Sequence, residues 1–362
     1  MFLTIKKSKR TIFRTRRYDR TNFKHSFSQK NKFKKPQKQY PDQKPLVDVG
    51  ILAVSNNAER RLISFINTIA ESSPFGKAVL QDAADAGYTL AFENQKDSLG
   101  FCDPETKMLV LNPKMNDNTL IATLAHEARH AQQFIHGAEG NFGTYNLKCD
   151  VMYNRALEAD AETAAAATCH QIKVFGKNPA PWNKFEEDAP VMAENFIDAM
   201  PDAKAPISDK VLQKTFNGWY QDEIVVEGYE EGYIQDVMND AMKDRAEEDL
   251  SYSGTISSKE IVNQICLNAK GECYWADNLG VLEDPEKLSL CAESVNTADR
   301  FFKVREVRTG MKPDTSYKSM PVRDPENLKG AKNKTLASKK EKSAADALRQ
   351  TKIAAQIAGK CR

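Results

Sequence analysis

Two histidines and a glutamate near the middle of the chain have the spacing of a metal site. Residues 124–133 read Leu-Ala-His-Glu-Ala-Arg-His-Ala-Gln-Gln and contain the pattern H-E-x-x-H at His126, Glu127 and His130. On a helix, a separation of four residues brings both imidazoles to one face, about 6 Å apart along the axis. The same pattern also arises by chance in surface helices with solvated histidines. Here, however, two of the five histidines of the chain stand in one motif.

The residue types in this motif point to zinc-assisted hydrolysis. Two imidazoles and one carboxylate suit zinc, because its tetrahedral coordination then keeps a fourth position for water. We predict that His126 and His130 bind zinc. Glu127 follows the first ligand directly and is the predicted general base, which takes a proton from the water and later delivers it to the leaving group. The expected reaction is the cleavage of an amide bond.

A third ligand is expected from the next helix. Glu158 comes 32 residues after His126, beyond a glycine-rich loop, so an antiparallel return can bring it to the metal. We predict Glu158 as the third metal ligand, with Asp160 and Glu162 as alternatives. Glu162 is also placed to accept the other N–H of a ligand histidine and so to fix its tautomer. The competing interpretation of these carboxylates is a solvated helix face.

His136 is a rival third ligand, because it lies ten residues after His126, as in H-E-x-x-H-x-x-G-x-x-H metalloproteases. In those proteins the glycine ends the helix, whereas here Gln133 stands in its place and the first glycine is Gly137. A continuing helix directs His136 about 120° away from His130. We therefore expect a C-terminal histidine that interacts favourably with the helix dipole.

Other polar residues of this region have weaker predicted roles. Tyr145 and Tyr153 are candidates for stabilising the oxyanion, although packing is the simpler interpretation of both. Arg155 is expected to pair with a carboxylate of its own helix. His170 lies about 18 Å along that helix from Glu158, which places it too far away to share the metal.

The elements that must position these residues are mainly helical. Apolar residues at helical spacing predict the active-site helix over 119–136, with an N-cap among residues 116–118, and a long alanine-rich helix over 147–174. Short β-prone segments at 88–92 and 107–111 predict a small hairpin or sheet before them. Further helices are predicted at 57–70, 74–86, 184–200, 208–219, 231–249, 257–269 and 285–306.

Charge divides the chain into an acidic body and two basic ends. Residues 1–45 contain 15 Lys or Arg and two acidic residues, and residues 329–362 contain ten Lys or Arg and two acidic residues. The residues between them contain 27 Lys or Arg and 46 acidic residues. We predict a basic disordered tail over 1–45, a zincin-like metallopeptidase domain over 46–178, a helical region over 179–312, and a basic, largely disordered tail over 313–362. Lys and Arg interleaved with aromatic residues in the first tail also fit binding to nucleic acid or an anionic surface.

The start of the chain and its cysteines favour the cytoplasm. Met1-Phe2-Leu3 is followed almost at once by lysines, which does not match the apolar stretch of a secretory signal, and no segment approaches a membrane span. Signal-independent export is the alternative. Seven cysteines without a C-x-x-C pair predict reduced thiols rather than a disulfide framework.

These motifs resemble the zincin metallopeptidases, in particular the thermolysin-like group whose third ligand is a glutamate on a second helix. The run Arg155-x-x-Glu158-x-x-Ala161-Glu162 is similar to the glutamate helix of membrane-associated members, which usually have Asp where Glu162 stands. The run around His126 also resembles a bacterial metallopeptidase family of unknown function. The resemblance implies a zincin core, in which a small sheet lies beside the active-site helix and an edge strand aligns an extended peptide. The segment 88–111 is the candidate for that sheet.

The sequence thus predicts an α+β, mainly helical protein with a small β-sheet or hairpin beside the active-site helix, followed by a helical region. The predicted function is that of a zinc metallopeptidase that acts on protein or peptide substrates. The alternative is a catalytically silent helical interaction protein, whose basic tails also fit an association with nucleic acid. A requirement for Glu127 distinguishes the two functions, because a structural metal site tolerates its loss.

Overall fold

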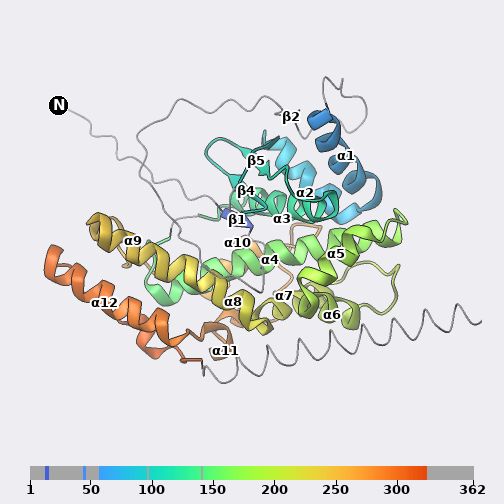
Figure 1. Cartoon of the computed structure of the whole chain (residues 1–362). Helices are drawn as coiled ribbons and strands as arrows, with labels where there is room; N and C mark the ends of the chain where they lie inside the picture. Colours follow the sequence, from blue (N-terminus) through green and yellow to red (C-terminus); the bar gives the residue numbers. More distant parts are fainter. Residues whose placement is uncertain (1–12, 16–43, 46–56, 96–97, 140–141, 324–362) are drawn as a thin grey trace, which may run out of the picture.

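The described part of the protein is mainly helical and contains a small β-sheet, as the sequence predicts (Figure 1). The computed structural model describes residues 13–15, 44–45, 57–95, 98–139 and 142–323. The α-helices are α1 (Asn57–Ser72), α2 (Pro74–Asp85), α3 (Asp117–Ile135), α4 (Leu147–Val174), α5 (Ala180–Asp188), α6 (Pro190–Ala199), α7 (Asp209–Gln221), α8 (Glu223–Glu230), α9 (Val237–Asp244), α10 (Ser258–Ile265), α11 (Pro285–Leu288) and α12 (Ala292–Thr309). A π-helix, η1 (Glu231–Asp236), joins α8 to α9, and three short 3-10 helices are η2 (Glu247–Asp249), η3 (Val281–Glu283) and η4 (Ser316–Ser319).

Of the two predicted alternatives, a small hairpin or a small sheet, the structure has a sheet. Its strands are β1 (Phe13–Thr15), β2 (Lys44–Pro45), β3 (Thr89–Phe92), β4 (Gly100–Asp103) and β5 (Met108–Leu111), in the spatial order β1-β4-β5-β3-β2. The two predicted strands, β3 and β5, are parallel to each other, so they do not form a hairpin. The hairpin partner of β5 is β4, which the sequence did not predict because four residues that are all buried show no alternation of polar and apolar side chains.

The helix that carries His126 and His130 and the helix after it begin and end close to their predicted positions. Asn116 caps α3, since its side chain accepts a hydrogen bond from the backbone N–H of Thr119 (3.0 Å). His136 is the C-cap residue of the same helix. Asn146 caps α4 in the same way, through the backbone N–H of Cys149 (2.9 Å). Local capping chemistry therefore explains why these boundaries could be predicted.

Helix α4 is the central element of the fold. In Figure 1 it runs through the middle of the molecule, between α1, α2, α3 and the sheet on one side and α7, α8 and α11 on the other. Small side chains permit this dense packing: a Cβ atom added to Gly76 in α2 would meet Thr168 of α4 at 2.6 Å. Because α4 is covered on all sides, even its polar residues are almost entirely buried.

The second half of the chain is helical, as predicted, but its helices are more divided. Pro190 begins a new helix, so the predicted helix over 184–200 consists of α5 and α6. The predicted helix over 285–306 likewise consists of α11 and α12. Buried side chains from Leu62 to Met320 form one hydrophobic cluster, which extends across the predicted boundary at residue 178. The division into two domains stays a prediction, and most of both predicted tails lies outside the described residues.

Candidate metal centre

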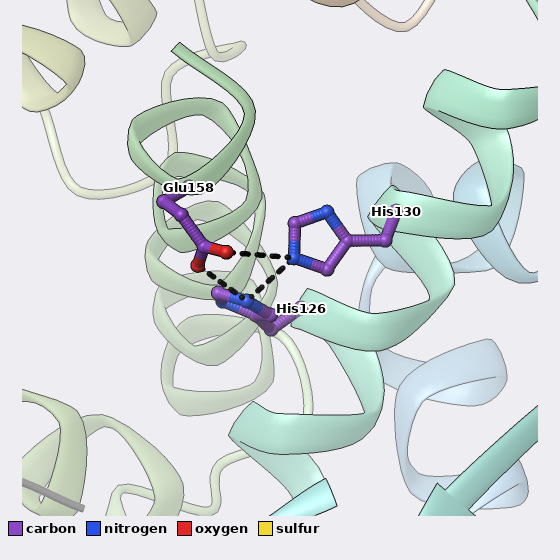
Figure 2. Close-up of side chains that lie close together, drawn as sticks. All are labelled: His126, His130 and Glu158. Atoms are coloured by element: carbon purple, nitrogen blue, oxygen red, sulfur yellow. Dashed lines mark hydrogen bonds and ion pairs between the residues drawn. The ribbon is translucent and has the colours of Figure 1, made fainter. Parts of the chain in front are cut away.

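The structure brings His126, His130 and Glu158 together between α3 and α4. Figure 2 shows both imidazoles pointing from α3 toward the carboxylate on α4. Nε2 of His126 lies 3.0 Å from Nε2 of His130 and 3.4 Å from Oε2 of Glu158. Nε2 of His130 lies 3.8 Å from Oε1 of Glu158. One ligand atom from each residue lies within 4.8 Å of the others, so the three side chains form a potential metal site.

The spacing of these atoms fits a zinc ion. Ligands that surround zinc tetrahedrally at about 2.0–2.2 Å lie about 3.3–3.6 Å from one another. The three observed separations, 3.0, 3.4 and 3.8 Å, bracket this value. Two imidazole nitrogens and one carboxylate oxygen are also a donor set that zinc prefers. The side chains present therefore fit the metal that their types predict.

Burial and charge determine how the cluster holds protons without a metal. His126, His130 and Glu158 are each at most 1% exposed. Burial alone would lower the pKa of His126, but the charge of Glu162, hydrogen bonds to Glu158 and Glu162, and the charge of Glu127 raise it well above its usual value. Burial lowers the pKa of His130 to about 4. Burial alone would raise the pKa of Glu158, but its hydrogen bond to His126 and the neighbouring imidazoles hold it below the usual value. A positive His126 then faces a negative Glu158.

Glu127, the predicted general base, is buried beside the cluster. Its carboxylate is one of the charges that raise the pKa of His126. Glu127 also influences Cys102, a residue of β4. The pKa of the Cys102 thiol is raised mainly by burial and then by the charge of Glu127. Glu127 therefore lies close enough to His126 and to Cys102 in β4 to influence the charge of each.

The three carboxylates of α4 that are candidates for the third ligand have different partners. Glu158 faces the imidazoles. Glu162 approaches the other side of His126, with Oε1 3.4 Å from Nδ1. Asp160 points to a different neighbour and pairs with Arg129 at 2.6 Å. Asp160, two positions from Glu158, points to another side of α4. Glu162, one turn after Glu158, lies on the same side but approaches Nδ1 of His126 rather than the atoms that His126, His130 and Glu158 bring together.

The remaining predicted residues lie apart from the cluster. His136 is exposed at the end of α3. His170 packs against Trp182, with ring centroids 5.2 Å apart, and belongs to the hydrophobic interior. Tyr153 accepts a hydrogen bond from the backbone N–H of Glu139 (2.5 Å), and Tyr145 packs on the ring of Tyr153. Both tyrosines are therefore packing residues, and the predicted oxyanion role has no support from their positions.

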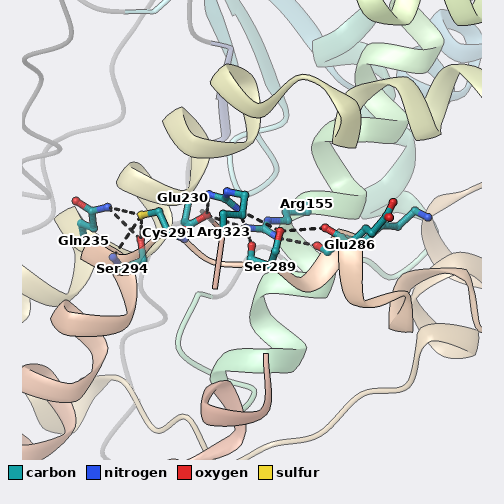
Figure 3. Close-up of polar contacts among 9 residues, drawn as sticks. Arg155, Glu230, Gln235, Glu286, Ser289, Cys291, Ser294 and Arg323 are labelled. Atoms are coloured by element: carbon teal, nitrogen blue, oxygen red, sulfur yellow. Dashed lines mark hydrogen bonds and ion pairs between the residues drawn. The ribbon is translucent and has the colours of Figure 1, made fainter. Parts of the chain in front are cut away.

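Arg155 pairs with a residue outside its own helix, contrary to the prediction. Its Nη2 lies 2.9 Å from Oε2 of Glu230, the last residue of α8, and Arg323 binds the same carboxylate (Figure 3). Arg155 also donates to the backbone carbonyls of Lys287 and Ser289. Arg155 and Glu230 are each 2% exposed. This buried cluster ties α8 to α4, one turn before Glu158.

Tyr233 is a site residue that the sequence analysis missed. It lies in the π-helix η1 and donates a hydrogen bond from its hydroxyl to Oε1 of Glu158 (2.9 Å). Its ring packs on Tyr229, with centroids 5.5 Å apart. π-helical turns are rare and often occur at functional sites. No motif marks Tyr233, and 75 residues separate it from Glu158, so only folding reveals the contact.

A mainly apolar pocket of about 70 Å³ adjoins the centre at His126. His126 and Glu162 belong both to the pocket wall and to the surroundings of the cluster. The wall combines the residue before β4 with residues of the segments from α3 to α8: Leu99, Thr119, Ala122, Thr123, His126, Glu162, Lys184, Phe185, Asp188, Ala189, Met192, Trp219 and Val225. The helices after residue 179 therefore contribute directly to the space beside the centre.

The centre lies within a region that matches a known family. The model of a family described as "Putative metallopeptidase family (DUF6782)" matches residues 47–276, more than half of the chain, and this range includes every residue of the cluster. No curated protein and no solved structure matches the chain. No described helix has the length and apolar character that a membrane span requires.

Proposed function

The chain belongs to this family, and we propose that it is a zinc-dependent peptidase that cleaves amide bonds in protein or peptide substrates. The observation that carries the proposal is the buried cluster of His126, His130 and Glu158, whose ligand atoms lie within 4.8 Å of one another. These three side chains hold the zinc ion. The family description supports metal-dependent peptide hydrolysis, and the donor set supports zinc.

Each side chain of the centre has a distinct proposed role. Zinc held by the three ligands supplies Lewis-acid chemistry, because it lowers the pKa of a water molecule and polarises a carbonyl group. The Glu127 carboxylate takes the proton from the attacking water and delivers it to the departing nitrogen. Glu162 accepts the Nδ1 proton of His126, and Tyr233 orients Glu158 through its hydroxyl.

The surroundings of the centre indicate how a substrate approaches it. The apolar wall of the pocket at His126 suits an apolar side chain of the substrate. Strand β4 packs beside α3, and an extended peptide could align with it as an additional strand. In the structure, β1 of the same chain already pairs with β4, with Arg14 opposite Phe101. A substrate that binds in this way has to displace β1.

The test combines metal content with hydrolysis. Zinc per chain is measured by mass spectrometry after purification without chelators, and cleavage is measured on casein and a peptide library. The variants are His126→Ala and Glu127→Gln, with His136→Ala as the matched control because His136 is the exposed histidine of the same helix.

We expect one zinc per chain in the wild type, in Glu127→Gln and in His136→Ala, and none in His126→Ala. Hydrolysis is lost in both His126→Ala and Glu127→Gln and persists in the control. Zinc binding without a requirement for Glu127 would indicate a structural site in an interaction protein. Absence of zinc from the wild type would overturn the proposal.

A further inference from the structure

We propose that Gln133 and Asp160 are positioning residues that keep the proton of His130 on Nδ1 and thereby leave Nε2 free to bind the metal. The inference rests on the proposed function, since it concerns the second metal ligand. It adds two residues to the centre that have no assigned role in it. Gln133 lies three positions after His130 on α3, and Asp160 lies two positions after Glu158 on α4.

The hydrogen bonds of Gln133 fix the orientation of its side-chain amide. Its Nε2 lies 3.0 Å from the backbone oxygen of Leu157 and 2.7 Å from Oδ2 of Asp160. Both of these partners accept hydrogen bonds, so the amide must direct its NH2 group toward them. A flipped amide would place three acceptors together in a buried space, which is unfavourable. The oxygen of Gln133 therefore faces His130.

This orientation determines the tautomer of His130. Oε1 of Gln133 lies 2.8 Å from Nδ1 of His130, and a carbonyl oxygen can only accept. Nδ1 must then carry the proton and donate it. A neutral imidazole has one proton, so Nε2 keeps its lone pair. Nε2 is the atom that faces His126 and Glu158. The lone pair thus points into the proposed metal position before any metal binds.

Asp160 is itself held firmly, so it can hold Gln133. Arg129 binds it through two hydrogen bonds, from Nε to Oδ2 at 2.6 Å and from Nη2 to Oδ1 at 2.9 Å. The Tyr274 hydroxyl donates to Oδ1 as well (2.9 Å). Paired, charge-assisted hydrogen bonds of this kind are strong and directional. Tyr274 comes from the loop after α10, so the far half of the chain helps to orient a metal ligand on α3.

The neighbouring residue supplies a matched control. Gln132 is also a buried glutamine of α3, but its amide contacts Arg129 and Asp82 rather than His130. Gln133→Met and Gln132→Met each replace one buried amide by an apolar chain of similar length. Both variants lose polar contacts and should lose stability. Only Gln133→Met removes the oxygen that accepts the hydrogen bond from Nδ1 of His130.

The first experiment measures metal affinity on the full chain. Apo protein competes with a chromophoric chelator for zinc, and the visible absorption of the cobalt-substituted protein reports the ligand geometry. We expect Gln133→Met to weaken zinc binding about 10- to 100-fold, as loss of a ligand's supporting hydrogen bond usually does. Gln132→Met should bind zinc as the wild type does. Equal affinities of wild type and Gln133→Met would overturn the inference while the proposed function stands.

The second experiment reads the tautomer in the metal-free wild type and does not depend on a variant that folds. Long-range nitrogen–proton correlation spectra of protein labelled in histidine report which ring nitrogen carries a proton, and comparison with His130→Gln assigns the signal. We expect His130 to be protonated on Nδ1. A proton on Nε2 instead would overturn the inference. Protonated Nδ1 in a protein that binds no zinc would support the hydrogen-bond chain and refute the proposed function.

Discussion

Replacing Glu230 with Gln should destabilise the protein strongly, although Glu230 is not part of the metal centre. The carboxylate accepts hydrogen bonds from Arg155, Arg323 and the backbone N–H of Cys291, which lies 2.7 Å away. The variant keeps the shape of the side chain but leaves the 2% exposed Arg155 without its counter-charge. Breaking a buried ion pair on one side costs about 3–5 kcal/mol. We expect a loss of that size in the free energy of unfolding.

Urea unfolding at pH 7 measures this loss, with Asp117→Asn as the control. Asp117 also forms an ion pair, with Arg61 at 2.7 Å, but its side chain is 60% exposed. Solvent screens such a pair, so its removal should cost at most about 1 kcal/mol. If both variants lost similar free energies, the reasoning that burial makes the Glu230 cluster costly to break would be refuted.

The difference in the free energy of unfolding between wild type and Glu230→Gln should also depend on pH, which provides a second check. Burial acts to raise the pKa of Glu230, but the guanidinium groups of Arg155 and Arg323 hold it below its usual value. The unfolded state then takes up a proton at a higher pH than the folded state does. The stabilisation is therefore fully present at neutral pH and is lost as the pH falls below the unfolded pKa toward the folded one. The difference in the free energy of unfolding between wild type and Glu230→Gln should therefore become smaller as the pH falls.

Three further substitutions test other contacts. Tyr233→Phe removes the hydroxyl bonded to Glu158 and should weaken zinc binding about tenfold, with about 1 kcal/mol of stability lost; chelator competition and urea unfolding measure the two effects. Glu162→Gln should weaken zinc binding by a similar factor, because it removes the charge beside Nδ1 of His126; an unchanged affinity would argue against this contact. Burial, and then Lys173, lowers the pKa of His170 from 6.5 to about 4, so wild-type stability should decline as the pH falls through that range. The decline should be smaller in His170→Phe than in the wild type, because His130 and Glu230 still contribute to it; a pH series of unfolding curves measures the difference.

Local information in the sequence determined the framework of the centre. His126 and His130 are four residues apart, and helix geometry places side chains at this spacing on one face. Helices α3 and α4 have strong local signals, namely Asn caps at their starts and apolar residues at helical spacing, and their bounds agree with the prediction within two residues. The antiparallel return that carries Glu158 to the histidines requires only a short connection between these two helices. A cluster of side chains that resides on one helix pair could therefore be predicted from the sequence.

Only the tertiary structure decided which other side chains surround His126 and His130. Nothing in the spacing of Glu158, Asp160 and Glu162 chooses among them, because the choice depends on how α4 is rotated against α3. The role of Tyr233 depends on a contact across 75 residues, and no local pattern encodes such a contact. Strand β4 and its pairing with β5 were likewise missed, since a short buried strand is specified by its neighbours rather than by its own residues. Spacing along one helix is set by the chain itself, whereas the rotation, pairing and covering of helices and strands are set by side chains that meet only in the folded core.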